Sequence, residues 1–205
     1  KIGFSGAEIG TAYSTTAWAA VVSPFFIGMV ADRFFAAQKV LGILHILGAA
    51  LMYFASLQHS FAIFFWVLFA YALCYMPTLA LVNAISFNQM DRPDKEFPGI
   101  RVLGTLGWIV AGLVVGYLKI EASALPLQIA AGSSLLMGLY SFTLPNTPPK
   151  SVGQKVSVGQ ILGLDALKLM KNPSFAIFVI SSLLICIPLS FYYTWTNPFL
   201  NNYLC

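Results

Sequence analysis

From Val40 to Met90 the chain runs for 51 residues without a single Asp, Glu, Lys or Arg. A helix that crosses a bilayer needs about 20 largely apolar residues to span roughly 30 Å of hydrocarbon. The run is too long for one crossing, and the polar triplet Gln58-His59-Ser60 interrupts it in the middle. It therefore predicts two membrane-spanning helices in succession.

The composition of the whole chain agrees with a membrane environment. Of the 205 residues, 59% are hydrophobic and 9% are charged, whereas a soluble domain has about 25% charged residues. So few charges cannot cover a water-facing surface, which excludes a soluble globular or disordered chain. The net charge of +4 comes from charges too sparse to follow a phosphate backbone, so we expect no nucleic-acid partner.

The remaining apolar runs predict four further crossings. The six expected spans lie near residues 9–31, 38–57, 61–88, 99–118, 123–144 and 173–200. They are long and continuous and lack the alternating pattern of a membrane β-barrel. The expected fold class is therefore all-α, a polytopic transmembrane helical bundle.

Basic residues are distributed unevenly between the loops. Nine of the eleven Lys and Arg residues follow the first, third and fifth predicted spans. Cytoplasmic loops carry an excess of Lys and Arg, so we predict that these loops face the cytoplasm and that the chain begins outside. The sequence starts at Lys1 and stops soon after an apolar run, and we expect it to be a fragment.

Residues 145–172 form the one predicted linker. Pro148 and Pro149 end the fifth span, because proline cannot continue a helix. Residues 159–171 have the pattern of a short amphipathic helix on the inner membrane surface, with a soluble linker helix as the alternative. The expected parts are an amino-terminal bundle at 1–144, a cytoplasmic linker at 145–172, and the first span of a carboxyl-terminal bundle at 173–205.

The first span ends in a short motif, Gly28-Met-Val-Ala-Asp32-Arg33. It resembles the cytoplasmic-loop signature of the major facilitator superfamily, although the later Gly-Arg-Arg part of that signature is Phe35-Ala36-Ala37 here. Gly28 would permit close helix contact, and Asp32 and Arg33 would interact with a neighbouring helix end, which predicts a role in conformational gating. An ordinary interfacial turn is the alternative. The resemblance places the chain at helices two to seven of that fold.

Two further stretches narrow the resemblance. Residues 75–86, within the third span, and residues 97–108, at the start of the fourth, are similar to bacterial nucleoside:proton symporters of the superfamily, as are residues 162–167. The resemblance implies alternating-access import of nucleosides with protons, in the inner membrane, without a cofactor or an obligate protein partner. The alternative is a superfamily carrier for another small solute, a sugar or a drug.

Arg101, Thr105 and Trp108 are the main site candidates. At helical spacing they lie within about 60° of one another on one face. An arginine inside the membrane must face protein or a water-filled cavity; its guanidinium and the threonine hydroxyl suit hydrogen bonding, and the indole suits stacking on a base. The resemblance implies that these three line the nucleoside site. The alternative is that Arg101 reaches back to the cytoplasmic interface and Trp108 faces lipid.

Other polar side chains in the spans are candidate substrate contacts. They are Tyr75 and Asn83 in the third span and Tyr192, Tyr193 and Asn197 in the sixth. For Asn83, a hydrogen bond between helices is the alternative. Binding residues that nearer family members carry in the sixth span are not matched here, and Tyr192 or Tyr193 would substitute for them.

The chain lacks the clustered side chains of a membrane enzyme. Its two histidines, His45 and His59, are fourteen positions apart, and no spacing suits a metal or a catalytic group. Glu8 follows Ser5 by three residues, which predicts a helix capping box rather than a proton carrier. Glu8, Asp32 and Glu121 lie at span ends and none is central, so we expect the proton-coupling carboxylate in the missing carboxyl-terminal half.

Overall fold

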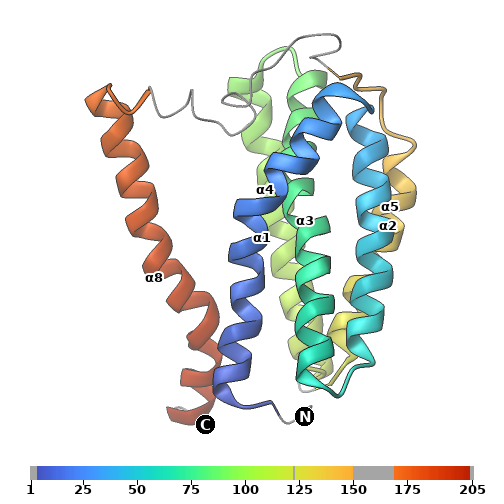
Figure 1. Ribbon diagram of the computed structural model, residues 1–205, viewed down its shortest axis with the longest axis vertical. Helices are drawn as coiled ribbons and strands as arrows, with labels where there is room; N and C mark the ends of the chain where they lie inside the picture. Colours follow the sequence, from blue (N-terminus) through green and yellow to red (C-terminus); the bar gives the residue numbers. More distant parts are fainter. Residues whose placement is uncertain (1–3, 122, 150–168, 204–205) are drawn as a thin grey trace. The chain divides into compact units, whose positions relative to one another are not determined.

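The structure is a computed structural model that describes residues 4–121, 123–149 and 169–203 (Figure 1). For residues 24–26, 28–33, 194, 197–198 and 200–203 it describes the backbone alone. The chain divides into two compact units, residues 1–153 and residues 154–205. The described residues form α-helices and short connections. The helices are α1 (Gly6–Arg33), α2 (Ala37–Ser56), α3 (Phe61–Gln89), α4 (Pro93–Leu118), α5 (Leu125–Ser141) and α8 (Pro173–Tyr203).

The capping box predicted at the start of α1 is confirmed. The Glu8 amide donates to the Ser5 hydroxyl at 3.3 Å, and the Ser5 amide donates back to the Glu8 carboxylate at 2.7 Å. The Ser5 hydroxyl also donates to this carboxylate, at 2.8 Å. The two bonds that the carboxylate accepts lower the pKa of Glu8 because they favour its charged form, and the bond from the Ser5 amide has the larger effect. Glu8 therefore serves the helix terminus, as expected.

Each predicted span corresponds to a helix, and the differences lie at the ends. Helix α4 begins at Pro93, six residues before the predicted span. Pro93 is at the first helical position, where its missing N–H costs nothing, and Asp94 and Glu96 in the first turn favour a helix amino terminus. The extra turn and a half is charged, so it lengthens the helix rather than the apolar span.

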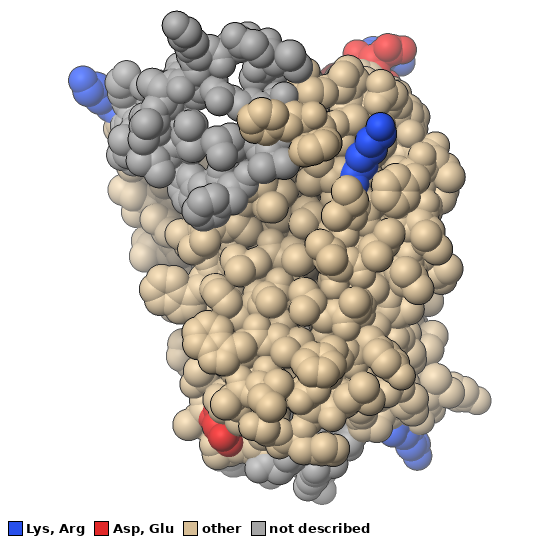
Figure 2. Space-filling model, turned by 45° about the vertical axis from the view of Figure 1, so that its right-hand side comes forward, with Lys and Arg blue, Asp and Glu red and all other residues tan. Residues whose placement is uncertain are grey.

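Among the described residues, four helices are long and apolar enough to cross a membrane, namely α2, α3, α4 and residues 173–193 of α8. Helix α5 has 17 residues and so measures about 25 Å, slightly less than the hydrocarbon core. In α1, most side chains of residues 24–33 lie outside the described part. The crossing of the membrane by α1 and α5 stays a prediction. Figure 2 shows that on one face the charged side chains lie toward two ends and that the surface between them carries none.

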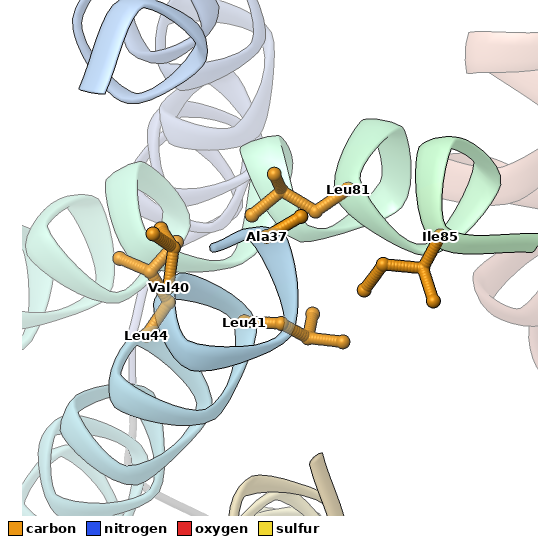
Figure 3. Packing of buried hydrophobic residues seen from close by; sticks show 6 residues of the cluster. All are labelled: Ala37, Val40, Leu41, Leu44, Leu81 and Ile85. Atoms are coloured by element: carbon orange, nitrogen blue, oxygen red, sulfur yellow. The ribbon is translucent and has the colours of Figure 1, made fainter. Parts of the chain in front are cut away.

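Helices α1, α2, α3 and α5 pack together in the first unit. Helix α3 packs against both α1 and α2, and α2 packs against α5 (Figure 1). The buried centre lies between α2 and α3 (Figure 3), where the cluster consists of Ala37, Val40, Leu41, Leu44, Leu81 and Ile85. Leu41 has no exposed surface. Apolar contact at this centre therefore fixes the register of α2 against α3.

Helix α4 belongs to the same unit but packs little within it. None of its residues is buried. It contacts α3 near their connecting turn, where the rings of Phe87 and Phe97 lie 4.5 Å apart. The side chains of α4 therefore remain accessible within this unit, including those of the three main site candidates.

Candidate functional site

The three main site candidates lie on one uninterrupted helix. Arg101, Thr105 and Trp108 are all exposed on α4, and Trp108 is 65% exposed. Because α4 is continuous from Pro93 to Leu118, positions i, i+4 and i+7 fall within about 60° of one another. The Thr105 hydroxyl donates to the Arg101 carbonyl at 3.5 Å. This face of α4 thus presents a cation, a hydroxyl and an aromatic ring side by side.

Capping residues hold the amino-terminal part of α4 in place. The backbone N–H of Arg92 donates to the Glu96 carboxylate at 3.0 Å, which satisfies a donor at the helix terminus. Arg101 follows Pro93 by eight residues and is therefore about 12 Å further along the axis. The guanidinium is thus carried by a regular part of the helix, well beyond its first turn.

Tyr75 lies on α3 within an aromatic stack. Its ring is parallel to that of Tyr71, with centroids 5.6 Å apart at 14°, and it meets the His45 ring edge-on at 6.5 Å. Asn83 is half-buried eight residues further along α3. The structure places both candidates on α3, while the Arg101 group is on α4, and whether they bind one ligand together stays a prediction.

A hydrogen-bonded pair joins α2 to α5 beside this stack. The Ser134 hydroxyl donates to the His45 carbonyl at 2.9 Å and lies 3.0 Å from His45 Nδ1. A hydroxyl has one proton, so while Ser134 donates it to the His45 carbonyl, His45 Nδ1 can bond to Ser134 only as the donor. His45 is therefore a hydrogen-bonded packing residue, and the sequence analysis did not identify Ser134 as its partner.

The gating candidates fall where only the backbone is described. Gly28, Asp32 and Arg33 occupy the last turns of α1, and their side chains lie outside the described part. The predicted amphipathic helix at 159–171 lies almost wholly outside the described residues. The roles of both stay predictions.

The sixth-span candidates lie on α8, in the second unit. Tyr192 and Tyr193 are exposed, and their rings meet at 5.4 Å and 74°. Asn197 is part of the same helix, with only its backbone described. Their approach to a ligand held by α4 depends on how the two units meet, and it stays a prediction.

Potential metal ligands are not clustered in the part of the chain that the structure describes. Within residues 4–121, 123–149 and 169–203, no group of three or more His, Cys, Asp or Glu side chains could hold a metal ion. Several long, apolar helices with few charged side chains define a multi-pass helical membrane protein.

Comparison with known proteins identifies the family. A family model described as nucleoside H+ symporter matches residues 1–204, so the chain belongs to this family. It is 49% identical to YegT of Escherichia coli K12, over 98% of this chain and 49% of YegT. It is 36% identical to the xanthosine permease of the same organism, over 98% of this chain and 49% of the permease. The chain thus spans about half the length of the relatives it matches.

Solved structures agree with this assignment. A crystal structure of the nucleoside transporter NupG, in a mutant form, aligns with a TM-score of 0.85 at 37% identity, over 98% of this chain and 51% of that one. The predicted all-α, partial major-facilitator-like bundle is therefore confirmed. The family and the relatives named here are transporters and permeases rather than enzymes, as expected.

Proposed function

We propose that this chain forms part of a secondary transporter that imports nucleosides together with protons by alternating access. The family match over residues 1–204 carries the proposal. Relatives named xanthosine permease and nucleoside permease NupG support a nucleoside as the transported solute. The proposed location is the bacterial inner membrane, with the basic loops on the cytoplasmic side.

The exposed face of α4 is the proposed nucleoside contact in this half of the transporter. Arg101 would donate to ribose hydroxyls or a base carbonyl, Thr105 would donate and accept, and Trp108 would stack on the base. Tyr75 and Asn83 on α3 would extend the site. Because such transporters bind substrate between two halves near the midplane, the candidates on α8 (Tyr192, Tyr193 and Asn197) would complete it from the other side.

Proton coupling and gating are assigned to different regions. The family name supports a proton as the coupling ion, and no other cofactor is proposed. The acidic residues of the predicted spans lie at their ends, so the coupling carboxylate is proposed for the rest of the transporter. Gly28, Asp32 and Arg33 are proposed to gate the cytoplasmic side.

Uptake of radiolabelled uridine by cells that produce the full-length protein tests this proposal. We expect uptake above that of cells lacking the protein, and we expect a proton uncoupler to abolish the accumulation. Labelled sugars serve as the comparison. Sugar uptake without uridine uptake would show that the protein is a superfamily carrier for another solute. Uridine uptake that the uncoupler does not affect would exclude proton coupling.

A further inference from the structure

The amide side chain of Gln38 holds the beginning of the linker. Its Nε2 donates to Asn146 Oδ1 at 2.8 Å, and its Oε1 accepts from the backbone N–H of Thr147 at 3.0 Å. The two partners are 108 and 109 positions further along the chain. Gln38 and Thr147 are each only 4% exposed. We call these three residues the linker anchor.

The linker also completes the start of α2. Ala36, the capping residue of α2, makes no side-chain hydrogen bond to the first turn. The Ala37 N–H instead donates to the Thr147 carbonyl at 3.0 Å, which satisfies a donor that a helix terminus leaves free. Both backbone groups of Thr147 are thus bonded to residues 37 and 38. Neither the start of α2 nor the start of the linker keeps its hydrogen bonds if the other moves.

The segment held by the anchor is stiff. Pro145, Pro148 and Pro149 flank Asn146 and Thr147, and each proline ring fixes its own backbone φ angle. Fixing Thr147 therefore also restrains the backbone from Pro145 to Pro149. Gln38 is the second residue of α2, directly after the short α1–α2 loop, so the anchor joins the α2 end of that loop to the linker.

We propose that Gln38 is a positioning residue of the transport cycle, which makes the α1–α2 loop and the start of the linker move as one body. This inference rests on the proposed function. Rigid-body movement of two halves drives alternating access, and such conformational steps commonly limit turnover. Gln38 contacts residues of the linker rather than any substrate-binding candidate. Its loss should therefore reduce turnover and leave nucleoside affinity unchanged.

Gln38→Met in the full-length protein tests this role. Methionine keeps the length of the side chain and removes both hydrogen bonds. Gln38→Glu is the conservative variant: a carboxylate still accepts from Thr147, and Asn146 can turn its amide to donate to it. Gln58→Met is the matched control, because Gln58 is the corresponding amide at the other end of α2, where it bonds to the Phe54 carbonyl.

Turnover, affinity and accessibility are measured on protein reconstituted in proteoliposomes. For Gln38→Met we expect uridine turnover to fall by about tenfold, with a dissociation constant within about twofold of wild type. Gln38→Glu and Gln58→Met should both retain turnover near wild type. Accessibility is measured by maleimide labelling of Thr147→Cys in protein whose native cysteines are serine. Labelling should be slow with Gln38 and fast with Gln38→Met.

The outcomes separate the role of Gln38 from the function itself. Wild-type turnover in Gln38→Met would overturn the inference, even if labelling accelerates. Gln38→Met could instead lose affinity, thermal stability and turnover together, with no recovery in Gln38→Glu. That result would show that Gln38 only stabilises the fold. If the wild-type protein moves no nucleoside, the proposed function fails and the positioning role fails with it. Labelling then still reports whether Gln38 holds the linker.

Discussion

Gly42 on α2 and Gly138 on α5 face each other so closely that neither position has room for a methyl group. A Cβ atom at Gly42 would lie 3.0 Å from the Gly138 carbonyl oxygen and 2.8 Å from the Phe142 ring. A Cβ atom at Gly138 would lie 3.1 Å from the Gly42 carbonyl oxygen and 2.8 Å from Ile46 Cγ1. The two backbones therefore pack directly on each other, as small residues permit in membrane helices.

Gly138→Ala should destabilise the bundle, because the new methyl group meets backbone atoms that cannot rotate away. Overpacking of this kind costs about 1–3 kcal/mol. Gly132→Ala, on the same helix, is the control, since a Cβ there has no atom within 4 Å. It should be neutral or stabilising by up to about 1 kcal/mol. Unfolding of the purified full-length variants in mixed micelles measures both, and equal stability of the two would contradict the close packing.

Ser134→Ala should loosen the same helix pair through its polar contact. It removes the hydroxyl that bonds both the carbonyl and the ring of His45. Hydrogen bonds between membrane helices contribute about 0.6–2 kcal/mol, and a loss of that size is expected in the same unfolding assay. Ser133→Ala changes the exposed neighbour and should have no effect. A loss shared equally by both variants would show that the His45 bond is not its cause.

The positions of the helices could be predicted from sequence because each is an apolar run bounded by charge, proline or polar residues. The charge-free run at 40–90 separated correctly into α2 and α3. Contacts between distant residues could not be predicted. Gln38 and Thr147 are 109 positions apart, and no local pattern distinguishes the facing pair Gly42 and Gly138 from the exposed Gly132.

The candidate site was only partly predictable for a related reason. Helical spacing alone puts Arg101, Thr105 and Trp108 on one face, and the continuity of α4 confirms that geometry. Whether residues of α3 and α8 join them depends on packing between helices and between the two units. A local pattern carries no information about that packing, and the chain holds about half of the relatives' length.

Lys119→Gly should stabilise the end of α4. Lys119 caps this helix in the left-handed conformation, with φ of 53° and ψ of 38°. That conformation costs a residue with a Cβ about 1–2 kcal/mol, and glycine adopts it readily. A gain of about 1 kcal/mol in unfolding free energy is therefore expected. Lys119→Ala removes the same charge but keeps the Cβ, so a gain of equal size in that variant would point to charge rather than backbone strain.

Asp32→Asn should impair transport if the motif at the end of α1 gates the cytoplasmic side. The substitution keeps the size of the side chain but removes the charge that would face a neighbouring helix terminus. We expect uridine uptake to fall several-fold while the amount of protein in the membrane stays near normal. Glu8→Gln makes the same chemical change at the other end of α1 and should leave uptake intact. Wild-type uptake by Asp32→Asn would argue against the gating role.

Arg101→Ala provides the most direct test of the nucleoside site. An arginine within a membrane helix costs about 2.5–3.5 kcal/mol on insertion scales, less near the interface, so a compensating interaction is expected. If the guanidinium donates hydrogen bonds to the nucleoside, its loss should weaken binding by about 1.5–3 kcal/mol. This is about a ten- to hundredfold rise in the dissociation constant. Thr105→Ala and Trp108→Ala should each weaken binding less.

Arg101→Lys distinguishes substrate binding from reaching back to the interface. An ammonium group lacks the planar fork of donors, so lysine should restore little of the affinity if Arg101 binds the nucleoside. If Arg101 only reaches the aqueous interface, lysine should replace it fully and Arg101→Ala should bind with normal affinity. Arg92→Ala, at the amino-terminal cap of the same helix, controls for the loss of a nearby positive charge. Calorimetric titration of the purified, folded full-length variants with uridine measures each affinity. Equal affinity of wild type and Arg101→Ala would show that Arg101 does not bind the nucleoside.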